Sequence, residues 1–179
     1  MSNAVIIKES HEELGIFSQR FFHFMNLWTI YTDLLKGTYT PSLDDDQYPV
    51  SITMMLVLYA YFYSLVEDSN DGLNGFRVWR GRLPEEEAVI AVVEATVQPL
   101  LNHLRLFRNR LGFHGSRTWN RESAAFDLFN QHSGMDVFNA MKRFKAMNAA
   151  LFGMDAKLQA NDPAGIAHYR KILDKIAAS

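Results

Sequence analysis

The segment from Gln47 to Val66 contains no charged residue, and this feature constrains the fold more than any other. An uncharged helix of this length must be covered on more than one side, by other helices or by lipid. The segment contains Pro49 and several hydroxyl side chains, and acidic residues rather than Lys or Arg flank it, which is atypical of a membrane span. We therefore expect a helix near 49–67 that lies in the middle of a bundle and does not cross a membrane.

Apolar residues recur at helical spacing in the preceding segment. Their steps of three and four predict one buried face, and Gly37 and Pro41 are expected to end this helix. The residues of this face are Phe17, Phe21, Phe24, Trp28, Tyr31 and Leu35.

The second half of the chain shows the same helical pattern. "PEEE" at 84–87 places a proline and acids at the start of a helix that runs towards Leu111, with a kink expected at Pro99. The segment 67–83 contains three glycines and is expected to be a loop with room for a short turn. Its arginines either extend the basic surface or pair with the acids at 67, 68 and 71, and the pairing is favoured. Further helices are expected at about 122–131, 135–158 and 162–178, and Asp162 and Pro163 begin the last of these.

No strand-like alternation stands out, so the predicted fold class is all-α, a bundle of long antiparallel helices. The length of 179 residues and the 48% apolar content suit a single helical domain over 1–179. Methionines at 135, 141, 147 and 154 recur along one helix, where core filling is the first interpretation and a dimer or partner groove the alternative.

Composition excludes several classes of function. The net charge of −2 means that any basic surface must be local, and the absence of cysteine excludes disulfides, iron–sulfur clusters and thiol catalysis. The histidines form no HxxxH pair, no phosphate-loop motif is present, and the acids at 44–46 are interpreted as a solvated loop, so we expect no metal and no cofactor. The first residues lack the pattern of a signal peptide, and a cytoplasmic location is expected.

The segment 104–121, "LRLFRNRLGFHGSRTWNR", is the basic surface that such a chain allows, because it holds five arginines and no acid. On a helical wheel Arg108 falls within the apolar stripe around Leu104, whereas Arg105, Asn109 and Arg110 fall outside it. A charge on that stripe needs a partner, because burying it alone is costly. Either Arg108 pairs with Glu67, Asp68 or Asp71, or it lines a crevice or a subunit interface and binds an anion.

His114 follows the basic helix between Gly112 and Gly115. A lone histidine is most often packed or solvated, but its ordinary pKa permits proton transfer near neutrality. Glycines on both sides allow a ligand to approach the backbone closely.

The motif "RNRLGFH", Arg108 to His114, resembles the signature of HEPN domains, in which an arginine and a polar residue precede a histidine by a few positions. HEPN domains are all-α bundles, and the likeness to abortive-infection-type members covers about residues 10–150. Some families have a tyrosine shortly after the histidine, which "HGSRTW" lacks.

The resemblance implies a homodimeric, metal-independent endoribonuclease that leaves 2′,3′-cyclic phosphate ends, in phage defence or in a toxin–antitoxin pair with a partner protein. It implies that His114 acts as acid or base or positions the scissile phosphate, that Arg108 holds that phosphate, and that Asn109 orients both. RNA would bind along a basic rim with one aromatic residue: Arg105, Arg110, Arg117, Trp119 and Arg121.

Two other hypotheses remain open from the sequence. Many HEPN proteins no longer cleave RNA, so the chain could be a helical module that binds nucleotide, RNA or a partner protein. Alternatively, it is a helical interaction protein in which Arg108 only pairs with an acid.

Overall fold

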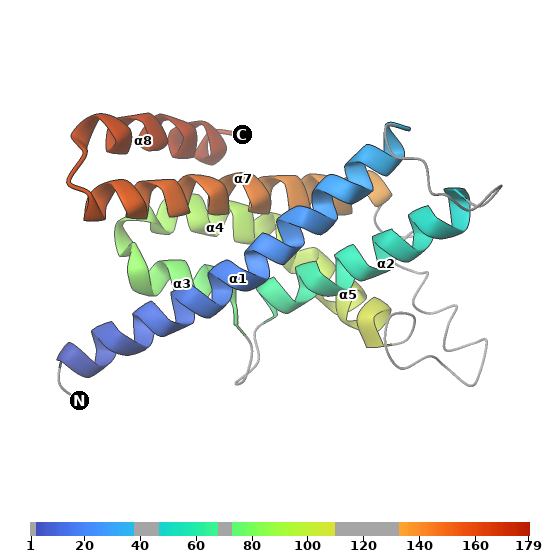
Figure 1. The fold of residues 1–179 in the computed structure, drawn as a ribbon, viewed down its shortest axis with the longest axis horizontal. Helices are drawn as coiled ribbons and strands as arrows, with labels where there is room; N and C mark the ends of the chain where they lie inside the picture. Colours follow the sequence, from blue (N-terminus) through green and yellow to red (C-terminus); the bar gives the residue numbers. More distant parts are fainter. Residues whose placement is uncertain (1–2, 38–46, 68–72, 110–132) are drawn as a thin grey trace. The chain divides into compact units, whose positions relative to one another are not determined.

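The computed structural model describes residues 3–37, 47–67, 73–109 and 133–179, and every element in these ranges is helical (Figure 1). This confirms the all-α class for the described part of the chain. The elements are α1 (Asn3–Leu35), α2 (Gln47–Val66), α3 (Gly75–Arg82), η1 (Pro84–Glu86), α4 (Glu87–Val97), η2 (Gln98–Leu100), α5 (Leu101–Phe107), α7 (Gly134–Gln159) and α8 (Pro163–Ala177).

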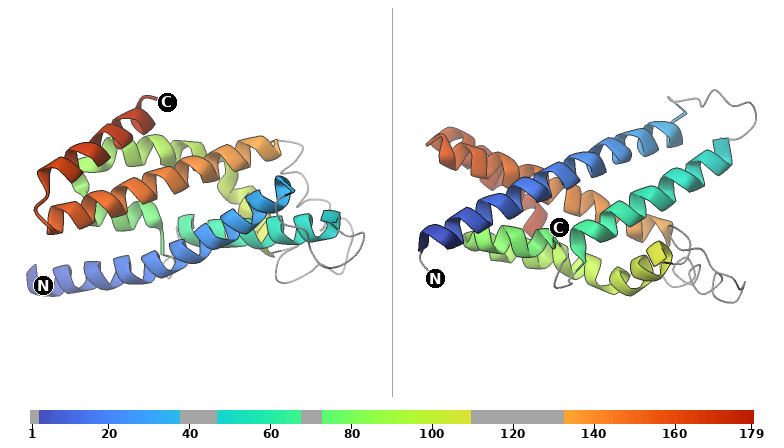
Figure 2. Two further views of the ribbon diagram at one scale, coloured as in Figure 1. Left: turned by 45° about the horizontal axis from the view of Figure 1, so that its top comes forward. Right: turned by 60° about the horizontal axis from the view of Figure 1, so that its bottom comes forward.

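The helices group into two compact units. The first unit contains α1, α2 and α5, and the second contains α3, α4, α7 and α8. Within each unit, consecutive neighbouring helices run antiparallel (Figures 1 and 2). The single domain over 1–179 stays a prediction.

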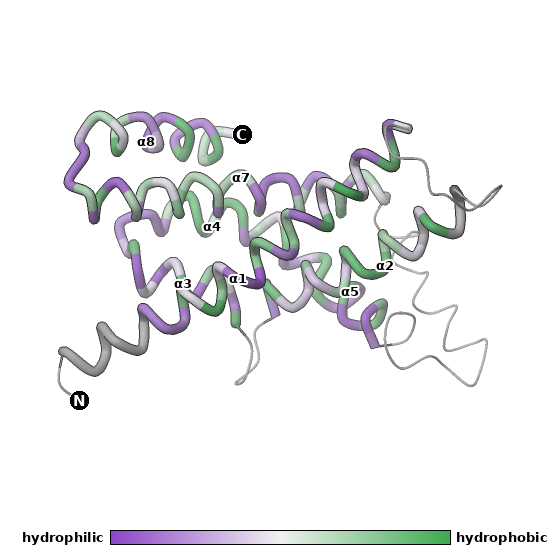
Figure 3. Tube along the Cα trace, viewed as in Figure 1, coloured by the Kyte–Doolittle hydropathy of each residue, from purple (hydrophilic) through white to green (hydrophobic). Residues whose placement is uncertain are grey.

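In the first unit, α2 packs against both α1 and α5. Phe62 meets Phe24 of α1 with ring centroids 6.0 Å apart, and Tyr59 meets Phe107 of α5 at 5.4 Å. Because α1 and α5 cover α2 on two sides, an uncharged helix is stable in this place. Figure 3 accordingly draws α2 mostly in green and white, the colours of hydrophobic and intermediate residues. Burial is concentrated in its second half, from Leu58 onwards, whereas Val50 to Val57 are at most half-buried where their side chains are described.

The buried face of α1 follows the predicted spacing for most of its length, since Phe17, Phe21, Phe24 and Trp28 are buried. At the C-terminal end the prediction is wrong by one position, because Leu34 is buried and Leu35 is 57% exposed. Gly37 ends the helix as expected, with a positive φ of 70° and an N–H that donates to the carbonyl of Leu34 at 3.1 Å.

In the second unit, α7 packs against α4 and α8. Its methionines at 141, 147 and 154 are buried, as core filling requires, whereas Met135 is 64% exposed. A capping box between Ser133 and Asp136 begins α7, and Asp162 caps α8 by accepting a hydrogen bond from the N–H of Gly165 at 3.0 Å. Both helices therefore lie within a residue or two of their predicted ranges.

The loop predicted for 67–83 is partly wrong, because Gly75–Arg82 form the helix α3. Phe76, Val78 and Trp79 bury its apolar face, and this tertiary packing outweighs the weak helical propensity of two glycines. Trp79 donates a hydrogen bond from Nε1 to Oδ1 of Asn148 at 2.7 Å, and both side chains are fully buried.

The expected kink at Pro99 is a short 3-10 turn, η2, that separates α4 from α5. Proline has no N–H to donate and clashes with the preceding turn, which interrupts the α-helix. The break also coincides with the boundary between the two units. None of the described helices is long and apolar enough to cross a membrane.

Candidate functional site

Arg108 and Asn109 follow α5 in a wider turn of π type. Such turns occur often at functional sites because they re-aim a side chain. Leu104 and Phe107 are buried, which confirms the apolar stripe of the wheel, and Asn109 is exposed. Arg108 lies between these extremes, with 35% of its side chain exposed. Its side chain is therefore partly accessible to solvent.

Glu67, the residue directly after α2, is the partner of Arg108. Nη1 of Arg108 donates a hydrogen bond to Oε2 of Glu67 at 2.6 Å. The carboxylate is the deeper partner, since only 20% of the Glu67 side chain is exposed. The sequence named Glu67 as one of three candidate partners, and the structure brings it to Arg108. The ion pair satisfies the structural hypothesis for Arg108 and leaves the rest of the guanidinium for other contacts.

Tyr63 lies one helical turn before Glu67, and its ring centre is 5.2 Å from Cζ of Arg108. This is the distance of a cation–π contact. Burial raises the pKa of the Tyr63 hydroxyl, Glu67 raises it further, and Arg108 and Arg105 lower it. The hydroxyl is therefore protonated at neutral pH. Tyr63 was not among the predicted site residues, although it lies four positions before Glu67, the spacing at which side chains share one side of a helical turn.

Arg105 is exposed on α5, and its positive charge acts on Tyr63. Nη2 of Arg105 approaches Oδ1 of Asn102 at 3.5 Å, which is a weak contact at most. The described site thus contains two arginines, one tyrosine and one carboxylate from the ends of α2 and α5. The remaining predicted site residues lie outside the described residues: Arg110, His114, Arg117, Trp119 and Arg121.

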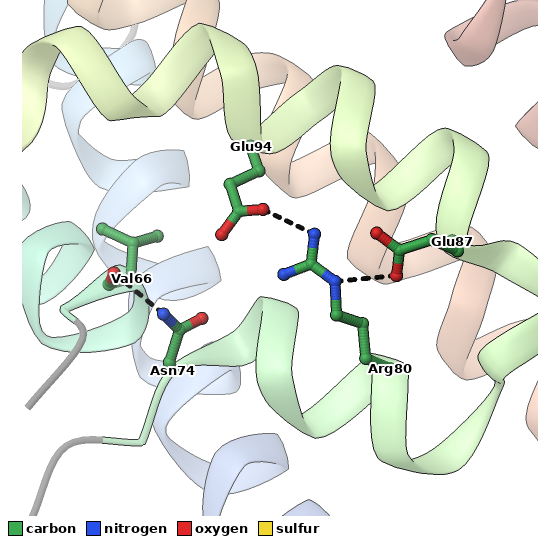
Figure 4. Close-up of polar contacts among 5 residues, drawn as sticks. All are labelled: Val66, Asn74, Arg80, Glu87 and Glu94. Carbon is green, nitrogen blue, oxygen red and sulfur yellow. Dashed lines mark hydrogen bonds and ion pairs between the residues drawn. The ribbon is translucent and has the colours of Figure 1, made fainter. Parts of the chain in front are cut away.

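Arg80 of α3 offers an instructive contrast within the second unit (Figure 4). Its Nε donates to Glu87 at 2.7 Å, and its Nη2 donates to Glu94 at 2.5 Å. Arg82 likewise donates to Asp155 at 2.9 Å. These arginines do pair with acids, but the predicted partners at 67, 68 and 71 are wrong for Arg80 and Arg82. Figure 4 also draws the amide of Asn74, which donates to the carbonyl of Val66 at 3.4 Å in the first unit.

Glu86 was interpreted as an acid that favours the start of a helix, and the structure gives it a second role. It is 3% exposed and pairs with Arg170 of α8 through nitrogen–oxygen contacts of 2.7 and 2.5 Å.

A separate surface hollow of about 420 Å³ lies between α7 and α8. There Arg143 already donates to the carbonyl of Ser179 at 2.8 Å. None of the predicted site residues lines this hollow.

Among the described residues, no group of three or more His, Asp or Glu side chains is placed to hold a metal ion. No protein-family model, curated protein or solved structure matches this chain. The candidate site therefore rests on the geometry at the ends of α2 and α5 and on the sequence motif that begins at Arg108.

Proposed function

We propose that this chain is an endoribonuclease of the HEPN type, in which Arg108, Asn109 and His114 act on an RNA phosphodiester. The observation that carries the proposal is the placement of Arg108 at the end of α5, paired on one edge with Glu67 and 35% exposed. Such an arginine can contact phosphate without leaving its anchored position. Asn109 is exposed directly beside it, as a polar residue that contacts substrate must be.

The chemistry requires few protein groups because RNA carries its own nucleophile. The 2′-oxygen attacks the adjacent phosphorus, the bond to the 5′-oxygen breaks, and a 2′,3′-cyclic phosphate forms. One proton leaves the 2′-hydroxyl and one proton reaches the 5′-oxygen, and His114 serves one of these transfers. Arg108 stabilises the negative charge that accumulates on the phosphate oxygens in the transition state.

The proposal includes a homodimer, because a HEPN site is built from two such motifs across a two-fold axis. Arg105 supplies a further phosphate contact from the described part of α5, and Arg110, Arg117, Trp119 and Arg121 complete the rim. An antitoxin or another partner protein would control the activity in a phage-defence or toxin–antitoxin setting. Light scattering should give twice the chain mass of 20.5 kDa.

The test is cleavage of a mixed-sequence RNA in EDTA, with wild type beside His114→Ala and with product ends analysed. Wild type should leave cyclic phosphate ends, His114→Ala should lose activity, and a 2′-O-methyl RNA should resist cleavage. Equal cleavage by wild type and His114→Ala would remove His114 from the mechanism. No cleavage by folded wild type would contradict the ribonuclease proposal.

A second candidate function is a helical module that binds RNA, nucleotide or a protein without cleaving. The observation that favours it is again the Glu67–Arg108 pair, since a satisfied ion pair also serves a purely structural purpose. RNA binding by wild type without any cleavage would support this candidate.

A further inference from the structure

The two side chains of the ion pair at the candidate site differ in how exposed they are to solvent. Glu67 is the more buried partner, at 20% exposure against 35% for Arg108, and it engages a single guanidinium nitrogen, Nη1. The ring of Tyr63 covers the guanidinium at 5.2 Å. Within the described residues, Nε and Nη2 of Arg108 have no hydrogen-bond partner. A guanidinium held at one corner therefore keeps a two-donor edge for another acceptor.

We propose that Glu67 is a positioning residue that fixes the guanidinium of Arg108, so that its Nε–Nη2 edge receives a phosphate oxygen of RNA. This inference rests on the proposed function and assigns a role to the residue that follows α2, which the sequence motif does not include. Glu67 acts through Arg108 and does not touch the substrate.

The balance of charge is compatible with this role. Glu67 carries one negative charge, and Arg108 and Arg105 together carry two positive charges beside Tyr63. Counted over the described residues alone, the site therefore keeps a net positive charge for a phosphodiester. The carboxylate is also the less exposed of the two side chains, which makes it the less accessible one to a phosphate. An arginine without such an anchor would sample several rotamers and would lose side-chain entropy when it binds.

The second unit provides a matched control. Glu94 and Arg80 have almost the same exposures, 20% and 33%, and pair at 2.5 Å. Arg80, however, has a carboxylate on two of its nitrogens, because Glu87 occupies Nε. Its edge is filled by protein, so we expect no phosphate contact there. Glu94→Gln thus removes an equivalent charge from an equivalent pair that has no proposed role in binding.

The experiment measures the affinity for a non-cleavable 2′-O-methyl RNA and the melting temperature of five proteins. These are wild type, Glu67→Gln, Arg108→Gln, the double variant and Glu94→Gln. Arg108→Gln should weaken binding about tenfold, as loss of a charged phosphate contact does. Glu67→Gln should weaken it about fivefold, within the usual range of coupling between contacting residues. Glu94→Gln should leave affinity unchanged within twofold.

The double variant separates positioning from general support of the fold. With Arg108 absent, Glu67→Gln should no longer weaken binding, because no guanidinium remains to be fixed. A purely structural Glu67 would weaken binding equally in both backgrounds, and that result would overturn the inference. If Glu67→Gln melts below the assay temperature, Glu67→Asp takes its place, since it keeps the charge but shortens the reach, and it should still weaken binding when Arg108 is present.

Failure of the inference differs from failure of the proposed function. Unchanged affinity in Arg108→Gln would remove Arg108 from RNA binding and would contradict both. A loss in Arg108→Gln together with unchanged or tighter binding in Glu67→Gln would leave the proposed function intact and would overturn the positioning role alone.

Discussion

Glu67 and Arg108 are separated by 41 positions in the sequence, and their side chains meet at 2.6 Å where α2 and α5 end. The contact ties the uncharged helix to the basic segment within one compact unit. It also gives the Arg108 guanidinium, which lies on an apolar stripe, a carboxylate that holds its Nη1 while the side chain stays partly exposed. Both the structural and the functional hypotheses for Arg108 begin from this pair.

Replacing Tyr63 tests the third member of the cluster. Tyr63→Leu removes the aromatic face beneath Arg108 and should lower the free energy of unfolding by about 0.5–1 kcal/mol, the usual strength of a partly exposed cation–π contact. Tyr63→Phe keeps the ring and should cost less. Urea unfolding of both variants checks this, and in an Arg108→Gln background the difference between them should shrink. An unchanged difference would show that the ring acts through packing alone.

Gly153 of α7 has the tightest surroundings among the glycines whose environment the structure describes. A Cβ at this glycine would lie too close to the ring of Tyr169 on α8, so Gly153→Ala must displace that ring. We expect a loss of about 1–3 kcal/mol in the free energy of unfolding, typical of overpacking. Gly81→Ala in α3 is the matched control, because nothing lies within 4 Å of its added Cβ, and helix propensity should make it neutral or stabilising. Equal effects of the two substitutions would contradict the packing of α7 against α8.

Trp79→Phe tests the buried hydrogen bond of the second unit. The substitution removes the Nε1 donor and leaves Oδ1 of Asn148 unsatisfied in a fully buried place. We expect a loss of about 2–4 kcal/mol, from the orphaned acceptor and the missing ring volume together. Chemical denaturation followed by circular dichroism measures it. A loss below about 0.5 kcal/mol would mean that the acceptor finds water or another donor.

Asp162 gives the second unit a defined dependence on pH. The N–H of Gly165 and the ammonium of Lys157 lower the pKa of the Asp162 carboxyl below its ordinary value of 3.8. A lowered pKa in the folded state stabilises the protein above the unfolded value, and this contribution is lost as the pH falls through the folded pKa. Asp162→Ala should therefore be less stable than wild type at pH 7, and the gap should close below about pH 4. Thermal melts across pH 2–7 measure this gap, and a gap independent of pH would contradict the role of the charge.

Sequence patterns predicted the elements whose signals are local. The cap at Asp162, the proline that follows it and the glycine at position 37 each act within a few residues, and the structure confirms them. The helix α3 was missed because its glycines suggest a loop, whereas burial of its apolar face, which includes Trp79, stabilises it as a helix. A contact that spans 69 positions leaves no local trace in a sequence.

The candidate site shows the same division. The helical wheel predicted Arg108 on the buried stripe. The need for an opposite charge indicated Glu67, Asp68 or Asp71 as its partner. The packing of α2 against α5 decides which acid pairs with Arg108, and it also brings Tyr63 to the guanidinium. Neither contact follows from the sequence alone. The partners of Arg80 and Arg82 were also predicted wrongly. Glu87 lies only 7 positions from Arg80, nearer than Asp71, whereas Asp155 lies 73 positions from Arg82, so separation along the chain did not identify either partner.

The most direct measurement of the central claim compares initial cleavage rates of Arg108→Gln and Arg80→Gln with that of wild type, on one RNA in EDTA. Both variants remove a half-exposed arginine from an ion pair, so a general effect on the fold should be similar. We predict that Arg108→Gln slows cleavage about 100-fold or more, as loss of a group that stabilises transition-state charge does. Arg80→Gln should retain the wild-type rate if it stays folded at the assay temperature. Wild-type cleavage by Arg108→Gln would contradict the account.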